Sequence, residues 1–414
     1  MKNKTISLIG GGIIGICCAL KLQSQGYKVT LIDRNDPASG CSSGNAGHFA
    51  TEQIFPMANF SILKKLPELL LYPQAPLKIK TSYILKALPW FVRFVMAAKK
   101  QTFEEGTKAL ISLNEASMLA YLPLIKMAQA ENLIQQKGYV LCFEGNNAFK
   151  MAQQEHKKLL PYGINQQLLD ENTIKDLEQN LSNCHSAIYY PDIYHSINPL
   201  KFAESLFNAF ILGGGSFLKQ DVLSVNSNSD ATINVSTRET TFSTDQVIIA
   251  AGAFSKSLVK NLGHKIPLET ERGYHLMVNQ DKLITRPVAF AQRRFIMTPL
   301  SHATRLAGTV EFAGLKNKAN WNRAEVLLKQ AQHFLKPMRN IDSNECSRWM
   351  GFRPSFPDSL PVIDRDRHNP NLFYAFGHHH LGLTQAAITA DLISNLINKE
   401  KPLVDIKPFS IHRF

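Results

Sequence analysis

A glycine-rich turn close to the start of the chain constrains the fold more than any other feature. Residues 5–9 form a short apolar run, and the next six residues, GGGIIG at 10–15, fit the pattern G-x-G-x-x-G. Apolar residues then recur at helical spacing as far as Gly26, and a second apolar run at 28–32 ends on Asp33. This order predicts a strand, a tight turn, a helix and a second strand, which is the unit that binds a dinucleotide.

Each position of the motif has its own physical reason. Gly10 permits the tight turn, Gly12 lets a pyrophosphate approach the backbone, and Gly15 lets the helix pack closely on the strand. The amides that open the helix favour phosphate because they are free and carry a partial positive charge. Asp33 follows about 20 residues after the glycines, where an acidic side chain meets a ribose hydroxyl. The motif by itself is compatible with both NAD and FAD.

A secretion signal is the competing interpretation of the same stretch, because Lys2 and Lys4 precede the apolar run. The run contains four glycines and continues into a polar helix face, whereas a signal peptide ends at a small-residue cleavage site. No stretch reaches the roughly 20 apolar residues of a membrane-spanning helix. The six cysteines show neither C-x-x-C spacing nor the density of a disulfide framework. We therefore expect a cytoplasmic protein with reduced thiols.

Strand and helix patterns of the nucleotide-binding kind recur in the middle and at the end of the chain. A helix over residues 198–212 precedes a strand at 216–219, a buried strand at 246–250 runs into a glycine, and a strand at 372–375 precedes the last helix. The predicted fold class is α/β. A Rossmann-like nucleotide domain, residues 1–60, 186–265 and 350–414, is interrupted by a β-rich α+β domain, residues 61–185 and 266–349. A long helix is expected over residues 105–135.

Four stretches together resemble one family, the FAD-dependent D-amino-acid oxidases and dehydrogenases. They are IGGGIIG…LIDR, SSGNAGH, VIIAAGAFS and MGFRPSFPDSLPVID…AFGHHHLGLT. The resemblance runs over nearly the whole chain and is strongest to the bacterial D-amino-acid dehydrogenases, which include dehydrogenases of D-hydroxyproline. The stretches ERGYHL at 271–276 and APLKIK at 75–80 are similar to that branch as well. The resemblance implies noncovalent FAD in the first domain and a small amino-acid substrate in the second.

The resemblance also assigns cofactor contacts to residues of this chain. The pyrophosphate and ribose positions are Gly10, Gly12, Ile13, Ile14, Gly15, Asp33 and Arg34, and the adenine and phosphate positions are Val222, Ala251 and Gly252. The positions along the cofactor are Ser42, Ser43, Asn45, Ala46, Gly47 and His48. The positions at the pyrimidine end of the flavin are Gly377, His378, Leu381, Gly382, Leu383 and Thr384.

Residues in the last part of the chain suggest two alternatives to noncovalent flavin chemistry. Related sarcosine oxidases attach flavin through a cysteine, but Met350 and Gly351 occupy that neighbourhood, so no covalent link is expected. Three adjacent histidines suggest a metal, but consecutive residues rarely converge on one ion, so no metal is expected. His379 stands where the family has a small residue, and Asp364 stands where a glycine is common.

Arg353 is the expected substrate anchor, because it matches the arginine with which the family binds the substrate carboxylate. A planar guanidinium can hold a carboxylate through two parallel hydrogen bonds. The alternative is a surface arginine in a proline-containing turn. Tyr274 and His275 are expected to cover the substrate. The sequence is equally compatible with the alternative, in which each is an ordinary packed side chain. Four weaker candidates are Tyr194, His195, Arg293 and Arg294.

The reaction that the resemblance implies is transfer of the Cα hydride to flavin N5, followed by electron transfer to a quinone-type acceptor. An oxidase of the sarcosine or glycine type, which would form hydrogen peroxide, is the first alternative. The second is the flavin domain of an RNA-modifying protein, which the net charge of +13 permits. No nucleic-acid recognition module accompanies that charge, so a nucleic-acid partner is not expected.

The segment at residues 60–101 is basic and aromatic, with eight Lys or Arg residues against the single acidic residue Glu68. It predicts peripheral attachment to an anionic inner-membrane surface, where a quinone would be available. A solvated helix face over core residues is the competing interpretation. The residues that suggest membrane contact are Trp90, Phe91 and Phe94, with Lys86, Arg93, Lys99 and Lys100.

Overall fold

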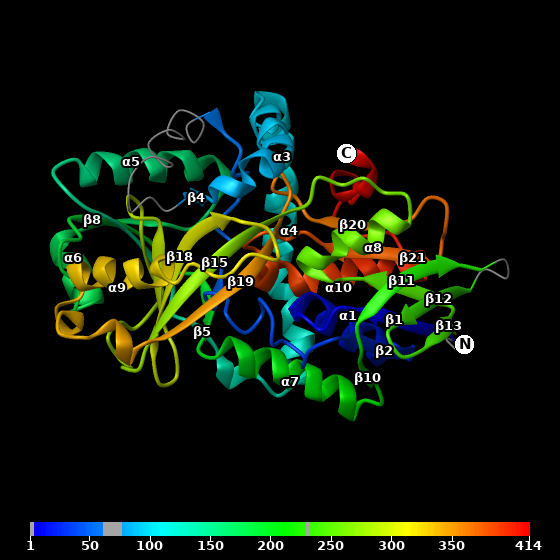
Figure 1. Ribbon diagram of the computed structural model, residues 1–414. Helices are drawn as coiled ribbons and strands as arrows, with labels where there is room; N and C mark the ends of the chain where they lie inside the picture. Colours follow the sequence, from blue (N-terminus) through cyan, green and yellow to red (C-terminus); the bar gives the residue numbers. More distant parts are fainter. Residues whose placement is uncertain (1–3, 61–76, 229–231) are drawn as a thin grey trace.

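The computed structural model describes residues 4–60, 77–228 and 232–414. The part of the expected membrane segment at 61–76, which includes Ala75 and Pro76 of the 75–80 stretch, lies outside the described residues. One half of the fold is a six-stranded sheet with the order β10-β2-β1-β14-β21-β20 (Figure 1). Its strands are β1 (Thr5–Ile9), β2 (Lys28–Asp33), β10 (Ser216–Lys219), β14 (Gln246–Ile249), β20 (Val362–Arg365) and β21 (Leu372–Phe376).

The first five strands in that order are parallel, and β20 is antiparallel to β21. The connections run outward from β1 in one direction and from β14 in the other, so a crevice is expected where these two strands end. Alternate side chains of β14 pack into hydrophobic cores on opposite faces of the sheet. Ile248 packs on one face, whereas Val247 and Ile249 pack on the other. Helices cover the first layer and a second small sheet covers the other, which makes this half a three-layer structure.

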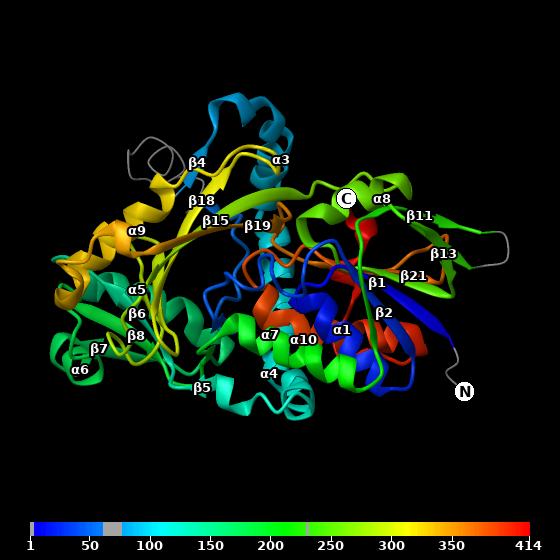
Figure 2. The ribbon, with the colours of Figure 1, turned by 60° about the horizontal axis from the view of Figure 1, so that its bottom comes forward.

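The helices of the first layer are α1 (Ile13–Ser24), α4 (Lys100–Met127), α7 (Pro199–Leu212) and α10 (Gly382–Asn398). The opposite layer consists of β11 (Val222–Ser227), β12 (Ile233–Thr237), β13 (Thr241–Thr244) and α8 (Ser255–Asn261). Figure 2 shows α1, α10 and α7 packed together beneath the strands β1 and β2.

The other half of the fold is a nine-stranded sheet, which lies to the left in Figure 1. Its order is β19-β15-β18-β17-β16-β6-β8-β7, and β4 pairs with β18. The strands are β4 (Leu77–Ile79), β6 (Tyr139–Phe143), β7 (Gln167–Asp170), β8 (Ser186–Tyr190), β15 (Glu269–Val278), β16 (Val288–Phe290), β17 (Phe295–Pro299), β18 (Thr304–Phe312) and β19 (Ser347–Ser355).

Helices cover parts of both faces of this larger sheet. On one face α6 (Glu171–Leu177) and α9 (Asn322–Phe334) bury apolar residues, and on the other face α5 (Ala148–Leu159) does so. A small sheet of β3 (His48–Phe49), β9 (Tyr194–Ser196) and β5 (Ile134–Gln136) joins the two halves. The fold class predicted from sequence, a Rossmann-like sheet with a second β-rich unit, is confirmed.

Some elements differ from the sequence prediction. The helix expected over residues 105–135 is α4, which begins earlier and ends at Met127; the left-handed backbone of Gln129, with φ of 51°, stops it, and a strand begins at Ile134. The segment around Arg353, for which a surface proline-containing turn was the alternative interpretation, is the edge strand β19. Pro354 is tolerated there because an edge strand can leave one side of its backbone unpaired.

Three elements lie across the domain boundaries that the sequence suggested. Strand β8 and the last residues of β19 belong to the nine-stranded sheet, although the sequence grouped them with the nucleotide-binding pieces. Helix α4, grouped with the substrate domain, packs on the nucleotide-binding layer, where the hydroxyl of Tyr121 donates to Leu383 O at 2.6 Å. The two units therefore share elements rather than meeting at one linker.

Helix α3 (Ile84–Ala97) corrects the expected membrane face. Trp90 and Phe94 are 6% and 8% exposed and pack on Ala58 and Phe312, so they belong to the core rather than to a lipid-facing surface. The periodicity places them on the inner side of an amphipathic helix, and the outer side carries aliphatic residues instead. Among the described residues no helix is long and apolar enough to cross a membrane.

A buried arginine ties the larger sheet to the loop that precedes α9. Arg272 on β15 has a side chain with no exposed surface, and its guanidinium donates to the carbonyl oxygens of Gly314, Asn317 and Lys318 at 2.8, 2.7 and 3.0 Å. Its Nη1 also lies 3.5 Å from Glu311. A buried charge with this many partners holds the loop in one conformation.

Replacing Arg272 with methionine is therefore expected to lower the free energy of unfolding by about 3 kcal/mol, because Glu311 and three carbonyl groups lose their donor. Chemical denaturation measures this change. The matched control is Arg348→Met on the neighbouring strand, whose partly exposed guanidinium pairs with Glu325 at 2.7 Å and should contribute less than about 1 kcal/mol. Equal losses in the two variants would contradict the structural role of Arg272.

Candidate active site

A cavity of about 870 Å³ lies between the two sheets, at the carboxyl ends of the parallel strands. Its wall includes Gly10 and Asp33 at the edge of the six-stranded sheet and Gly273, Thr309 and Arg353 on the nine-stranded sheet. In an open α/β sheet the ligand binds in the crevice outside these strand ends. The cavity therefore reaches from the predicted nucleotide site to the predicted substrate site.

The three motif glycines have different surroundings. Gly10 has φ of 116°, and a Cβ there would lie 2.4 Å from Ala250 O. A Cβ on Gly15 would lie 1.9 Å from Gly10 O, so no larger residue fits between α1 and β1. Gly12 borders the cavity, and a Cβ there would meet Ser42 Oγ at 3.4 Å, an ordinary contact. The fold itself requires Gly10 and Gly15, whereas Gly12 leaves space on the cavity side.

The start of α1 fits a pyrophosphate. Its N-cap residue, Gly12, has no side chain, and the first residues of the helix border the cavity. Ile13 N donates to Ser42 Oγ at 2.8 Å and Gly11 N donates to Asp33 Oδ2 at 2.7 Å, which holds the turn open. Asp33 lies in the cavity wall with acceptor capacity for ribose hydroxyls. These donors and acceptors are those that an extended FAD molecule needs at this end.

Most of the other predicted cofactor residues border the same cavity. They are Ile14, Arg34, Asn45, Ala46, His48, Val222, Ala251, Gly252, Gly377, His378, Gly382 and Leu383, together with Met350 and Gly351. Ser43, Gly47, Leu381 and Thr384 do not border it. Two of these four support the wall: Gly47 N donates to Asn45 Oδ1 at 2.8 Å, and Thr384 Oγ1 accepts from Ala50 N at 2.9 Å.

Each of the three adjacent histidines has a different partner outside the triplet, and the rings of His379 and His380 also contact each other. His378 Nε2 lies 2.9 Å from Thr389 Oγ1, and burial lowers the pKa of His378 to about 3, so it is neutral. His379 bonds to Glu271 and His380 bonds to Gln53. In the part of the chain that the structure describes, no group of three or more His, Cys, Asp or Glu residues is placed to hold a metal ion.

Arg353 lies at the substrate end of the cavity. Its guanidinium covers Gly273 so closely that a Cβ on Gly273 would lie 2.4 Å from the guanidinium carbon. Within the described residues it donates one long hydrogen bond, from Nη1 to Thr309 O at 3.5 Å. Burial lowers the pKa of Arg353, while the neighbouring Glu271 opposes the shift. The guanidinium is thus held in the wall with donors left for a carboxylate.

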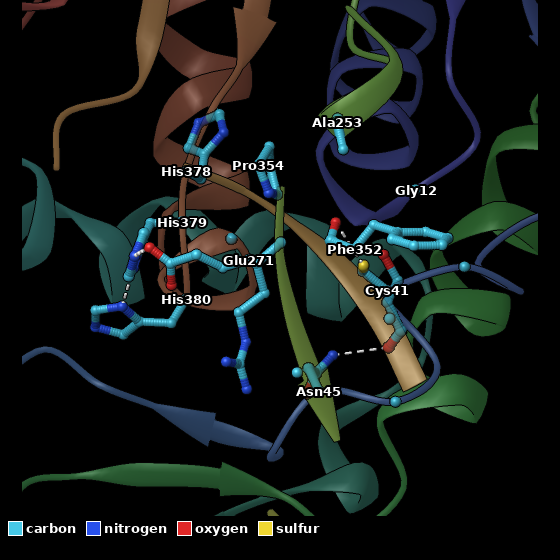
Figure 3. A pocket seen from close by; sticks show the side chains of 18 of the residues that line it. Gly12, Cys41, Asn45, Ala253, Glu271, Phe352, Pro354, His378, His379 and His380 are labelled. Atoms are coloured by element: carbon cyan, nitrogen blue, oxygen red, sulfur yellow. Dashed lines mark hydrogen bonds and ion pairs between the residues drawn. The ribbon is translucent and has the colours of Figure 1, made fainter. Parts of the chain in front are cut away.

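A carboxylate and two histidines beside Arg353 were not identified as a group from the sequence. Figure 3 shows Glu271 directed toward His379, whose ring meets that of His380. The His379 Nε2 to Glu271 Oε1 distance is 2.9 Å, and the His380 Nε2 to Gln53 Oε1 distance is 2.6 Å. Burial alone would raise the pKa of Glu271, but the charges of His379 and Arg353 hold it below its ordinary value.

The remaining sequence candidates lie less favourably for substrate contact. Tyr274 contributes to the wall, but its hydroxyl donates to Glu311 Oε2 at 2.6 Å in the core beneath α9. His275 stacks on Trp349 with ring centroids 4.9 Å apart and bonds to Gly44 O, and burial lowers the pKa of His275 to about 3. Its side chain supports the cavity wall from behind.

The four weaker candidates are dispersed. Tyr194 and His195 lie on β9 outside the cavity, and burial lowers the pKa of His195 to about 4. Arg293 forms two hydrogen bonds of 2.8 Å with Glu144, which uses its guanidinium away from the cavity. Arg294 borders the cavity. A residue that the sequence did not suggest, Cys41, also borders it, and burial raises the pKa of its thiol to about 11.

Comparisons with known proteins give a consistent result. A family model described as "FAD dependent oxidoreductase" (DAO) matches residues 6–396. A D-amino-acid oxidase of Bradyrhizobium diazoefficiens is 31% identical over 421 residues, covering 100% of this chain and 99% of the relative. A D-amino acid dehydrogenase of Vibrio atlanticus is 27% identical, covering 99% of both chains. The crystal structure of glycine oxidase from Geobacillus kaustophilus has the same fold, with a TM-score of 0.76, 19% identity and full coverage of both chains.

Separate alanine substitutions at Gly12 and Gly15 test the cofactor site. Gly12→Ala should leave the fold intact, because the new Cβ makes an ordinary contact, but it should strongly reduce bound FAD, because the Cβ occupies the pyrophosphate approach. Gly15→Ala should instead destabilise the protein, since its Cβ overlaps Gly10 O. The measurements are flavin absorbance per protein and thermal unfolding. A Gly12→Ala protein with full yellow colour would contradict the assignment.

Proposed function

The chain belongs to the family of FAD-dependent oxidoreductases known as DAO, and from that premise we propose that it oxidises a D-amino acid, or D-hydroxyproline, at the carbon that bears the amine. The full-length relatives named D-amino-acid oxidase and D-amino acid dehydrogenase support the substrate class. The chemistry that FAD supplies when bound is acceptance of the Cα hydride at flavin N5. The chain itself must bind the substrate, orient it and exclude water.

The observation that carries the proposal is the position of Arg353. Its guanidinium lies in the wall of the cavity that also reaches the nucleotide motif, rather than in solvent. An α-carboxylate bound to this planar fork would have a fixed orientation, which fixes Cα relative to the rest of the cavity. A monoamine without a carboxylate would leave the buried guanidinium unpaired, so we infer that amino acids are preferred over simple amines.

The first turn of α10 supplies a second feature that favours flavin chemistry. Gly382 and Leu383 begin this helix at the cavity wall, and no side chain caps its start. The positive end of the helix dipole therefore faces the cavity. If FAD is bound with its flavin at this wall, these fixed dipoles would stabilise the negative charge that the flavin gains on reduction, with no reorganisation during the reaction.

We further propose a quinone-type electron acceptor in an anionic membrane. Support comes from the outer side of α3, where aliphatic residues at a spacing of three or four are exposed: Leu85, Leu88, Val92, Val95 and Met96. The flanking basic residues Lys86, Arg93, Lys99 and Lys100 are exposed as well. An amphipathic helix of this kind lies in a membrane interface with its apolar side buried. The relative named as an oxidase favours oxygen as the alternative acceptor.

Replacing Arg353 with glutamine is expected to raise KM by about 100-fold or more with a smaller effect on kcat, because a charge-assisted bidentate contact worth about 3 kcal/mol is lost. Steady-state kinetics with a panel of D-amino acids and D-hydroxyproline measure the change. Arg293→Gln is the control, since Arg293 is occupied by Glu144 and should leave the kinetics unchanged. Equal KM values for wild type and Arg353→Gln would contradict the proposal.

Two measurements test the acceptor and the membrane surface. A dehydrogenase should reduce a quinone analogue without stoichiometric hydrogen peroxide, whereas peroxide equal to the substrate consumed would establish the oxidase instead. Leu85→Glu with Leu88→Glu should weaken sedimentation with phosphatidylglycerol vesicles at least about tenfold, because two apolar contacts become charged. Leu212→Glu, at an equally exposed leucine at the end of α7, is the control. Unchanged sedimentation of the double variant would contradict the membrane role.

A further inference from the structure

The two charged residues at the substrate end are direct neighbours that do not pair. Glu271 on β15 and Arg353 on β19 are opposite each other in the antiparallel register. Opposite residues of such strands have Cβ atoms about 5 Å apart, and opposite charges at these positions normally attract each other into contact. Yet among the described residues no ion pair joins them. Glu271 is bound instead to His379, at 2.9 Å.

The backbone conformation at His379 places its ring where it can form a hydrogen bond with Glu271. His379 has a left-handed φ of 52°, a conformation that histidine, like asparagine and aspartate, adopts more readily than most residues other than glycine. Its amide donates to Pro354 O at 3.0 Å, which links it to the end of the strand that carries Arg353. The left-handed conformation and the link to β19 place the imidazole against Glu271 rather than in the solvent.

The hydrogen bonds of this group determine its charge. The chain of contacts runs from Glu271 to His379, from His379 to His380, and from His380 to Gln53 Oε1. Glu271 accepts at one end, and at the other end Gln53 presents its Oε1 to His380, so in this amide orientation each of the three contacts needs one proton from the histidine pair. Two neutral imidazoles carry two protons, so this arrangement takes a third proton and gives the pair one positive charge. That charge lies beside the buried carboxylate of Glu271.

We propose that protonated His379 neutralises Glu271 and thereby keeps the Arg353 guanidinium free for the substrate carboxylate. His379 is a positioning residue in this account, because it acts through Glu271 and need not touch the substrate. The inference rests on the proposed function, since it takes Arg353 as the carboxylate anchor. Without the charge on His379, Glu271 would turn to the guanidinium opposite it and compete with the substrate.

Other charged groups around the site do not replace His379. The thiol of Cys41 near Arg353 is neutral, because burial raises its pKa to about 11. His48 lies beyond His380 and is paired with Glu52 at 2.9 Å. Arg353 itself is the one other cation close enough to influence Glu271 strongly among the groups described here. The relevant equilibrium is therefore between pairing of the Glu271 carboxylate with His379 and pairing of it with Arg353.

The test uses holoenzyme and 2-aminoisobutyrate, an amino acid without a Cα hydrogen, so that binding is measured without oxidation. His379→Asn keeps the left-handed backbone, because asparagine tolerates this conformation, but removes the charge. The expected result by calorimetry is a Kd raised about tenfold or more. In turnover of a D-amino acid the same variant should raise KM and leave kcat nearly unchanged.

Rescue by a second substitution separates this role from a structural one. Adding Glu271→Gln to His379→Asn removes the competing carboxylate, so the Kd should return to within about threefold of the wild-type value. Glu271→Gln alone should bind at least as tightly as wild type, which keeps the inference testable if the histidine variant does not fold. His264→Asn is the matched control, because His264 pairs with Asp366 at 2.7 Å outside the cavity.

Each outcome has a distinct meaning. An unchanged Kd in His379→Asn, an unrescued double variant, or weaker binding by Glu271→Gln would overturn the role of His379 while the proposed function stands. Arg353→Gln measured in parallel tests the premise. If that variant binds 2-aminoisobutyrate as wild type does, the carboxylate anchor is wrong and the proposed function fails with it.

Discussion

The contact between Gly15 and the carbonyl oxygen of Gly10 is the constraint on which the rest of the structure depends. No side chain fits there, since a Cβ on Gly15 would lie 1.9 Å from that oxygen. The close approach places the start of α1 at the carboxyl edge of the parallel sheet. The strands β14 and β21 then add to the other side of β1, and their ends bring Ala251, Gly252 and the start of α10 to the same edge.

The larger sheet forms the opposite wall of this nucleotide crevice and supplies its own charged residues. Strands β15 and β19 carry Glu271 and Arg353 on the side that faces the cavity, and α10 begins where His379 can reach both strands. A buried carboxylate and a buried guanidinium side by side would otherwise neutralise each other, which would leave little attraction for a substrate anion. The positive charge on His379 neutralises Glu271 and so leaves the Arg353 guanidinium able to attract a substrate carboxylate.

Local patterns predicted much of the fold and a large part of the cofactor site. The strand, turn, helix and strand at the beginning, the helix capped by Asn198 and the last helix were all identified from periodicity and glycine positions. Prediction failed where partners distant in sequence decide the conformation. Strand β19 contains a proline and forms because β15 pairs with it, and Trp90 and Phe94 turn inward because Phe312 lies beneath them.

The sequence by itself determined that the chain has a dinucleotide-binding unit, because the glycine pattern is a local steric requirement that neighbouring residues enforce. It also indicated Arg353 through the resemblance of its surrounding motif. The pairing of Glu271 with His379, more than 100 residues apart, was decided by the tertiary structure alone. Charges this far apart in the chain interact only after the two sheets are assembled, since electrostatic attraction depends on distance and burial rather than on sequence order.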